Sequence, residues 1–360
     1  MPTVSVRRVK AYDDDALYRA VCGHFEALSP HLTPDTRVLL KPNLLAARTP
    51  ALAVTTHPAL LRAVAVRLRE LGVKHITLAD SPGGVYTAAA LRKTYAACEY
   101  LPLVDCLTLN ENVGFHTKGR FSIIDPVLEA DFVINCPKLK THGLTVMSGG
   151  VKNLFGCVPG LQKPEQHCLH PSIEGFADML LDLAETVKPS LTLMDAVDCM
   201  EGNGPGGGKV RQAGYTLASR SVYALDEAAA ALMGLNPVMA PLIRHARKRG
   251  LYDPDSVTYT GDPLIAADPP FLLPDAIVTR ERFFSVSGLF HHFFGRKRTY
   301  PVIRAEKCVG CGRCAESCPK HLIDIVDRKA VIARKGCISC FCCQEMCPAR
   351  AIDVVRKRAW

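Results

Sequence analysis

Residues 308–319 read Cys308-Val-Gly-Cys311-Gly-Arg-Cys314-Ala-Glu-Ser-Cys318-Pro319, and residues 337–348 read Cys337-Ile-Ser-Cys340-Phe-Cys-Cys343-Gln-Glu-Met-Cys347-Pro348. Each run spaces four cysteines as C-x2-C-x2-C-x3-C and places a proline directly after the last one. Residues 308–326 align without a gap on residues 337–355, and the shared positions include a glutamate as well as the cysteines and the proline. The carboxyl end of the chain is therefore an internal duplication.

This cysteine spacing is the one with which bacterial-type ferredoxins hold four-iron clusters. Three thiolates around one cuboidal cluster have to come from a tight loop, whereas the fourth can come from elsewhere in the chain. In ferredoxins with two clusters, the fourth cysteine of each run serves the other cluster, and the proline turns the chain away because it cannot continue a helix. We therefore predict two 4Fe-4S clusters, one held by Cys308, Cys311, Cys314 and Cys347, and the other by Cys337, Cys340, Cys343 and Cys318.

Zinc is the alternative occupant, because CxxC pairs in reducing compartments often bind it. Zinc takes four ligands in a tetrahedron, commonly as two separated pairs, and it does not require a third cysteine at the same short step. Cys342 is a ninth cysteine in this region, and we interpret it as a bystander because its use would break the spacing. Residues 300–358 as a whole resemble the duplicated ferredoxin fold.

The chain has 360 residues, of which 48% are hydrophobic, so it can build two or three domains around sizeable cores. No apolar run approaches the roughly 18 residues that span a bilayer, and the amino end lacks an apolar signal core. Sixteen cysteines would suggest disulfides outside the cell, but clusters need reduced thiolates. We therefore predict no transmembrane segment and a cytoplasmic location.

The formal net charge of +9 raises the question of a nucleic-acid partner. The lysines and arginines scatter over predicted helix faces, and no basic stripe with interleaved aromatic residues occurs in the sequence. We therefore predict no nucleic-acid binding and expect that part of this charge lines a cavity for an anionic ligand.

Predicted strands and helices alternate along the first 233 residues. Strands are expected at 3–8, 37–41, 75–80, 101–105, 121–124, 131–135, 191–195 and 214–218, and helices at 14–28, from a cap at Thr56 to about Leu71, at 172–187 and at 226–233. Such alternation predicts an α/β fold with a mostly parallel sheet covered by helices, followed by a C-terminal α+β two-cluster ferredoxin-like domain.

Polar residues follow four of the predicted strands directly. Ligands of open α/β sheets gather outside the carboxyl ends of the strands, so these residues predict one lysine-lined cleft for a phosphate or carboxylate. Each of them also has an ordinary structural explanation, since lysines after strands are often solvated and single histidines are often capped or buried. The residues are Lys41 and Asn43, Asp80 and Ser81, Lys138, Lys140 and His142, and Asp195 and Glu201.

Two further motifs are weak. His167, Cys168 and His170 could contribute to a metal site, but a second pair of ligands is lacking. Residues 202–207 formally satisfy G-x-G-x-x-G, yet they neither follow a strand immediately nor open a helix, as a dinucleotide site requires. We interpret this loop as backbone that approaches a ligand or a neighbouring strand.

Taken together, residues 35–235 resemble the family catalogued as domain of unknown function 362. The resemblance rests on Lys41-Pro-Asn43, Thr56-His57-Pro58, Pro137-Lys138-Leu-Lys140-Thr-His142, Lys152-Asn153-Leu-Phe-Gly156 with His167 downstream, and Asp195 through Glu201-Gly-Asn-Gly-Pro205. Members of that family often carry a ferredoxin domain behind this region. The resemblance implies an architecture and a site, and it implies no reaction.

We predict an α/β domain at 1–280, an aromatic and basic linker at 281–299 and the ferredoxin domain at 300–360. The linker region is rich in phenylalanine, which predicts either packing between the domains or a patch for an electron-delivering partner or an anionic membrane surface. The phenylalanines are Phe271, Phe283, Phe284, Phe290, Phe293 and Phe294, and Arg296, Lys297 and Arg298 follow them.

The preferred functional hypothesis is an oxidoreductase in which the clusters pass single electrons to a small anionic substrate or cofactor in the cleft. The expected catalytic residues are His57, His142, Lys138 and Lys140, and the expected substrate-binding residues are Lys41, Asn43, Lys152, Asn153, Asp195 and Glu201. Joining both domains in one chain keeps donor and acceptor at high effective concentration.

Two alternatives remain open. The protein could be a ferredoxin-type electron carrier or assembly factor whose α/β domain docks a partner, or its clusters could be structural in a non-redox enzyme. A redox protein partner is expected if the protein is an oxidoreductase and also if it is an electron carrier. A flavin is also possible, since flavin sites often lack a sequence motif.

Overall fold

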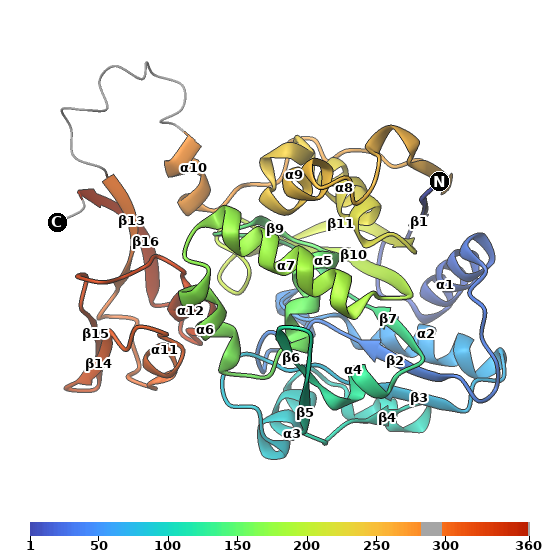
Figure 1. The fold of residues 1–360 in the computed structure, drawn as a ribbon, viewed down its shortest axis with the longest axis horizontal. Coiled ribbons are helices and arrows are strands. Elements are labelled where there is room, and N and C mark those ends of the chain that lie inside the picture. Colours follow the sequence, from blue (N-terminus) through green and yellow to red (C-terminus); the bar gives the residue numbers. More distant parts are fainter. Residues whose placement is uncertain (282–296, 359–360) are drawn as a thin grey trace.

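The computed structural model describes residues 1–281 and 297–358 (Figure 1). A ten-stranded sheet forms the centre of the first domain, in the order β12-β1-β11-β10-β7-β2-β3-β4, with β8 and β9 attached beside β10. The strands are β1 (Thr3–Arg8), β2 (Arg37–Lys41), β3 (His75–Leu78), β4 (Thr108–Leu109), β7 (Phe132–Asn135), β8 (Lys138–His142), β9 (Val146–Ser148), β10 (Leu191–Glu201), β11 (Lys209–Ser219) and β12 (Thr258–Gly261).

The sheet is mostly parallel, as predicted. The consecutive strands β4, β3, β2, β7 and β10 run parallel to one another, and β12 is parallel to β1. The antiparallel pairs involve β11, which lies between β10 and β1, and the short strand β9, which pairs with β8. A separate hairpin consists of β5 (Phe115–Lys118) and β6 (Phe121–Ile124).

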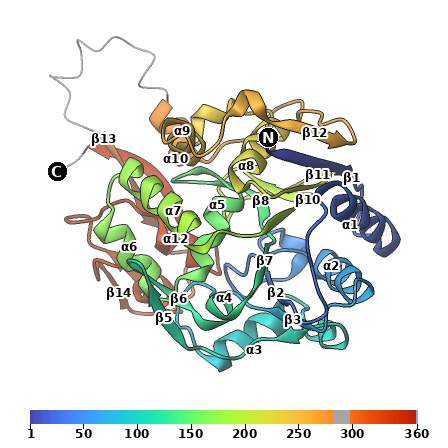
Figure 2. The ribbon, with the colours of Figure 1, turned by 45° about the vertical axis from the view of Figure 1, so that its right-hand side comes forward.

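Helices cover both faces of the sheet and create two hydrophobic cores (Figure 2). In β2, Val38 and Leu40 face one core while Leu39 faces the other, as the two-residue period of a strand requires. The first core contains α1 (Asp14–Leu28), α2 (Pro58–Glu70) and α3 (Ala88–Ala97), and the second contains α5 (Gly150–Asn153), α7 (Ile173–Val187), α8 (Val222–Leu232) and α9 (Pro241–Lys248); the short α4 (Asp125–Glu129) follows β6.

Two local predictions are wrong. Residues Leu101–Asp105 form a 3-10 helix and not a strand, because Pro102 lacks the amide that a ladder needs and Leu103 N–H donates back to the carbonyl of Tyr100 (2.9 Å). His57 and not Thr56 caps α2, since His57 Nδ1 accepts the N–H of Ala59 at 3.2 Å. The hydroxyl of Thr56 is engaged elsewhere and donates to the carbonyl of Cys136 (2.6 Å).

The ferredoxin domain repeats one unit twice. β13 (Lys297–Ile303) pairs antiparallel with β16 (Ile352–Arg358), and β14 (Ile323–Val326) pairs with β15 (Lys329–Ile332). Each run also contains a short helix that begins two residues after the second of its four cysteines. These helices are α11 (Arg313–Glu316) and α12 (Cys342–Met346). The gapless alignment of the two cysteine runs places α11 on α12 and β14 on the start of β16, so the duplication in sequence is also one in structure.

Helix α12 faces the α/β domain, and α6 (Gln162–Leu169) lies beside it (Figure 1). Arg48 donates one hydrogen bond to the carbonyl of Cys347 (3.0 Å) and one to that of Pro348 (3.2 Å). Met346 packs so closely on Gly83 that a Cβ at Gly83 would lie 2.5 Å from the Met346 sulfur. The loop between β3 and α3 is therefore shaped to accept α12.

Most of the predicted aromatic linker lies outside the described residues, including Phe283, Phe284, Phe290, Phe293 and Phe294. Phe271 is buried, and the Arg211 guanidinium lies 4.6 Å from the centre of its ring. Helix α10 (Asp275–Glu281) precedes the linker, and the domain boundaries themselves stay predictions. In the part of the chain that the structure describes, no helix is long and apolar enough to cross a bilayer.

Candidate functional site

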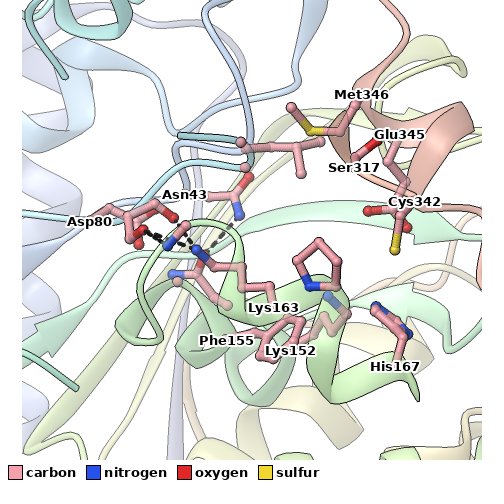
Figure 3. Close-up of a pocket in the computed structure, with 18 residues that line it drawn as sticks. Asn43, Asp80, Lys152, Phe155, Lys163, His167, Ser317, Cys342, Glu345 and Met346 are labelled. Atoms are coloured by element: carbon pink, nitrogen blue, oxygen red, sulfur yellow. Dashed lines mark hydrogen bonds between the residues drawn. The ribbon is translucent and has the colours of Figure 1, made fainter. Parts of the chain in front are cut away.

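A pocket lies between the two domains, beyond the carboxyl ends of β2 and β3 (Figure 3). It contains about 670 Å³ of space that no atom fills, including its open mouth. Among the polar side chains that line it are Asn43, Asp80, Lys152, Asn153, Lys163 and His167 from the α/β domain, and Ser317, Cys342 and Glu345 from the ferredoxin domain. Neither domain forms this pocket alone.

Lys152 presents an uncompensated cation to the pocket. Among the described residues it makes no hydrogen bond within normal distance and no ion pair within 4 Å, and its ammonium nitrogen lies 4.9 Å from the centre of the Phe155 ring. Burial lowers the pKa of Lys152, and the nearby Glu345 carboxylate opposes that shift. An incoming anion would therefore be a better partner than any the chain supplies.

Lys163 is a second pocket cation, and sequence reasoning missed it. Its ammonium nitrogen donates to the carbonyl and the hydroxyl of Ser81 (2.7 and 3.0 Å), which are both neutral. Burial lowers its pKa to about 7. Lys163 lies in the first turn of α6 and does not follow a strand in the sequence, so the rule that pointed to the other lysines could not indicate it.

Three asparagines, Asn43, Asn153 and Asn135, are joined by hydrogen bonds beside these lysines. Asn43 Nδ2 donates to Asn153 Oδ1 (2.8 Å), and Asn153 Nδ2 donates to Asn135 Oδ1 (2.8 Å). Lys140 lies behind Asn43 and donates to Asn43 Oδ1 and to the carbonyl of Val54, both at 2.7 Å. Burial lowers the pKa of Lys140 to about 7. Lys140 therefore positions Asn43 without lining the pocket itself.

Lys41 is fully buried and forms an ion pair with Asp80 at 2.8 Å. The other carboxylate oxygen of Asp80 accepts the N–H of Leu44 (2.8 Å). A Cβ at Gly156 would lie 1.9 Å from Asp80 Oδ1 and 2.8 Å from the Lys41 nitrogen, so this glycine lets the pair approach the backbone of 156. The negative charge of Asp80 in the pocket wall is thereby already neutralised.

His142 connects the α/β domain to α12. Its Nδ1 accepts the N–H groups of Leu144 (3.0 Å) and Thr145 (3.3 Å), so the proton of the neutral ring lies on Nε2. That nitrogen lies 3.1 Å from Glu345 Oε1. Burial would raise the pKa of the Glu345 carboxyl, but His142 and Lys152 hold that pKa at about 2. Glu345 is the glutamate that the two cysteine runs share.

The remaining predicted residues gather around Asp195, and we call Tyr12, His57, Lys138 and Asp195 the Asp195 cluster. Lys138 and Asp195 are fully buried and pair at 2.8 Å, and Tyr12 donates to Asp195 Oδ1 (2.9 Å). The backbone N–H of His57 donates to Asp195 Oδ2 (2.9 Å), and the His57 ring stacks on Tyr12 with centroids 3.5 Å apart. Burial lowers the pKa of His57 to about 4. None of these residues lines the interdomain pocket.

The structure therefore divides the predicted site. Asn43, Lys152 and Asn153 line the pocket, whereas Lys41, Lys140 and His142 lie behind its walls. Glu201 lies apart from both groups, where it pairs with Arg211 (2.9 Å) and accepts the N–H of Leu272. Their roles in binding or catalysis stay predictions.

The two weak motifs have structural roles. His167 stacks on Phe176 with centroids 4.1 Å apart, and Cys168 lies near the carbonyl of Pro319. Within residues 1–281 and 297–358, no group of three or more His, Cys, Asp and Glu side chains is arranged to hold a single metal ion. The glycine-rich loop approaches β8, because a Cβ at Gly204 would lie 2.1 Å from the carbonyl oxygen of Thr141.

The cysteines of the two runs line two small pockets inside the ferredoxin domain. One contains Cys308, Cys311, Cys314 and Cys347, and the other contains Cys318, Cys337, Cys340 and Cys343. Backbone N–H groups point at several sulfurs, as in the equivalent pairs Leu322 to Cys318 (3.4 Å) and Ala351 to Cys347 (3.2 Å). Four thiols with amide donors around an apolar space suit a cluster of negative charge, so the residues present fit the group.

Comparison with known families agrees with this donor set. Residues 300–348 match a family described as a 4Fe-4S dicluster domain, so the chain is an iron-sulfur electron-transfer protein. Residues 38–231 match the family described as Domain of unknown function (DUF362). The chain belongs to that family and carries a ferredoxin domain behind the matched region.

One curated relative is the Thylakoid-associated protein sll1697 of Synechocystis sp., which is 34% identical over 263 residues that cover 69% of this chain and 80% of the relative. Among solved structures, the lactate racemase apoprotein from Thermoanaerobacterium thermosaccharolyticum overlaps with a TM-score of 0.37 at 16% identity. That overlap covers 59% of this chain and 53% of the racemase chain. The cytoplasmic location of this chain stays a prediction.

Proposed function

We propose that this protein is an iron-sulfur oxidoreductase that passes single electrons from two 4Fe-4S clusters to a small anionic substrate or cofactor in the interdomain pocket. The proposed ligands are Cys308, Cys311, Cys314 and Cys347 for one cluster, and Cys337, Cys340, Cys343 and Cys318 for the other. Clusters of this kind supply one-electron transfers.

One observation carries this proposal. Four residues of the ferredoxin domain line the pocket, and three of them, Ser317, Cys342 and Met346, directly precede a proposed cluster ligand in the sequence. A molecule in the pocket would thus contact residues whose next neighbours in the chain are proposed ligands of both clusters. Cys342, interpreted from the sequence as a bystander, is one of these three residues.

The residues of the α/β domain supply binding and orientation in this proposal. Lys152 and Lys163 attract the anion, because neither has a carboxylate within 4 Å among the described residues. Asn43 and Asn153 offer amide groups whose orientation is held by their mutual hydrogen bond. Lys140 acts through Asn43 as a positioning residue.

The first test is anaerobic purification of the full chain, followed by iron and sulfide analysis and by mass analysis of any molecule that remains bound. Two four-iron clusters predict about eight iron atoms per chain. The reduced protein is then mixed with a panel of dicarboxylates, inorganic phosphate and phosphate monoesters, and the return of the visible cluster absorbance is timed. At least one anion should accelerate this return and should also raise the thermal unfolding temperature.

The matched variants are Lys152→Ala and, as a control, Lys248→Ala, which removes an exposed lysine at the end of α9. Lys152→Ala should abolish both effects of the anion and retain the iron content, whereas Lys248→Ala should behave as the wild type. If no anion changes either measurement, the proposal is wrong and the protein is better described as an electron carrier whose α/β domain docks a partner.

The carrier hypothesis has an observation of its own. Cys311 is exposed, and Val309, two residues before it, keeps 61% of its accessible surface. A proposed cluster ligand at the surface beside an apolar side chain suits contact with a redox protein partner. We propose such a partner under either hypothesis, and Val309→Glu should slow reduction by a protein donor without slowing reduction by dithionite.

A further inference from the structure

The interdomain pocket is bounded by apolar side chains on opposite sides. Phe155 lies across the pocket from Met346 in Figure 3, and Leu45 and Pro164 also line it. The Phe155 ring is fixed, because it packs edge-on against Phe176 with centroids 5.6 Å apart. The fixed Phe155 ring and the flexible Met346 side chain bound an open space between them, and a flat molecule in that space could contact both.

Glycines leave parts of the same walls without side chains. Gly83, Gly84, Gly156 and Gly160 all line the pocket. Gly160 is packed so tightly that an added Cβ would lie 2.5 Å from the carbonyl oxygen of Gly84, so these segments are in backbone contact. Bare backbone gives a flat surface with exposed peptide groups, which can contact a conjugated ring closely.

The charges of the pocket are unbalanced. Lys152 and Lys163 have no carboxylate within 4 Å among the described residues, while Asp80 is neutralised by Lys41. Glu345 is the other carboxylate in the lining, and His142 lies 3.1 Å from it. Lys152 and Lys163 can therefore both donate to one anionic group, such as a phosphate monoester, while Glu345 keeps its own negative charge beside the neutral His142 ring.

The lining also favours a molecule that is partly apolar and partly anionic. Apolar and charged side chains face one open space, whose unfilled volume of about 670 Å³ includes the mouth of the pocket. A simple inorganic anion would leave the apolar walls uncovered. A neutral ring system would leave the lysines without a partner.

We infer that the pocket holds a flat conjugated ring with a phosphate on its side chain, of the flavin mononucleotide class, with the ring between Phe155 and Met346 and the phosphate at Lys152. This inference rests on the proposed function and names the chemical class of its anionic ligand. The ring would lie beside Cys342 and Met346, which precede proposed cluster ligands.

The experiment titrates flavin mononucleotide into the anaerobically purified full chain and follows the quenching of flavin fluorescence. Riboflavin, which has the same ring without the phosphate, is the matched ligand. Flavin mononucleotide should bind about tenfold or more tightly than riboflavin, because a hydrogen bond between charged groups contributes about 1.5–3 kcal/mol. Inorganic phosphate should compete with flavin mononucleotide and not with riboflavin.

Three variants separate the two halves of the site. Lys152→Ala should weaken binding of flavin mononucleotide to the level of riboflavin and leave riboflavin binding unchanged. Phe155→Leu should weaken binding of both, and Met346→Leu provides a second test of the contacts to the ring, in case the Phe155 variant folds poorly; iron content and circular dichroism check the fold of each. Lys248→Ala should leave both affinities unchanged.

Equal affinities for the two flavins, or a Lys152→Ala variant that binds flavin mononucleotide normally, would overturn the inference. If flavin mononucleotide does not bind while dicarboxylates or phosphate still raise the unfolding temperature through Lys152, this inference falls and the proposed function stands. If neither kind of ligand binds, both fall.

Discussion

The Asp195 cluster contains a buried lysine and the interdomain pocket contains two half-buried ones, and their ammonium groups face different partners. Lys138 faces a fully buried carboxylate at 2.8 Å, and the same carboxylate accepts Tyr12 and the backbone of His57. Lys152 and Lys163 face neutral groups and the pocket. The ammonium group of Lys138 has its charge partner within the chain, whereas those of Lys152 and Lys163 would gain one only from a bound anion.

The difference has a physical consequence for stability. A buried ion pair is costly to break, because the remaining charge is left without a partner in a medium of low dielectric constant. A cation without a partner already bears that cost in the folded state, so its removal should cost little or even stabilise. Substitutions in the Asp195 cluster should therefore lower the free energy of unfolding, whereas substitution of Lys152 should weaken anion binding with little effect on stability.

The largest effect is expected at Asp195. Asp195→Ala strands the Lys138 cation and also leaves the Tyr12 hydroxyl and the His57 amide without their acceptor, so the free energy of unfolding should fall by about 3–5 kcal/mol. Urea unfolding followed by circular dichroism measures this change. Lys138→Met is the matched variant and should cost less, because the Tyr12 hydroxyl and the backbone N–H groups of His57 and Val197 still donate to Asp195. A loss below 1 kcal/mol for Asp195→Ala would contradict the description of this cluster as a closed unit.

The next effect concerns the pH dependence of stability. Burial lowers the pKa values of Lys140 and Lys163 to about 7 in the folded protein, whereas an unfolded lysine titrates near 10.4. Between these values the unfolded chain binds more protons, so the free energy of unfolding should rise with pH from about 7 to about 10.

Each of these lysines can contribute up to about 1.4 kcal/mol per pH unit in that window. Lys140→Met should remove its share of the slope, and urea unfolding at several pH values checks it. A slope that does not differ between the variant and the wild type would show that Lys140 keeps its proton in the folded state. It would then be as well stabilised as the paired lysines.

A smaller effect tests whether the pocket depends on the docking of α12. Gly83→Ala places a Cβ 2.5 Å from the Met346 sulfur, so the flexible end of the Met346 side chain has to shift, at a cost near the lower end of the about 1–3 kcal/mol usual for overpacking. The thermal unfolding temperature of the full chain and its affinity for the anion should both fall. The double variant Gly83→Ala with Met346→Ala should recover part of the loss, whereas strictly additive effects would mean that the two residues are not in contact.

The smallest effect on stability is expected at Lys152. Lys152→Ala should change the free energy of unfolding by no more than about 0.5 kcal/mol, because the ammonium group makes no ion pair among the described residues. The same variant should lose the stabilisation that anions confer. If it unfolds as readily as Asp195→Ala, Lys152 has a structural role and the two regions do not differ in the proposed way.

Much of the fold was predictable because local patterns specify it. The apolar period at 14–28 predicts a helix with the same bounds as α1, and the apolar runs at 37–41 and 131–135 predict central strands of the sheet. The prediction failed at Leu101–Asp105, where an apolar segment of suitable length contains a proline. Hydrophobicity alone does not distinguish a strand from a short helical turn.

The site was predictable only in part. The rule that ligands bind beyond the carboxyl ends of strands led to Asn43 and Asp80, which do line the pocket. The same rule indicated Lys138 and Asp195, which satisfy one another instead. The position of a residue after a strand predicts the edge of the sheet at which it lies. It does not predict which charged group will be its partner there.

The amino-acid sequence by itself determined the duplicated cysteine spacing, the alternation of strands and helices and the edge of the sheet where polar residues gather, because each of these depends on neighbours in the chain. Only the tertiary structure decided that α12 closes the pocket, that Lys163 and Glu345 belong to it and that Lys138 does not. These contacts join residues that are far apart in sequence, and their strength depends on burial and distance, which a linear pattern does not contain.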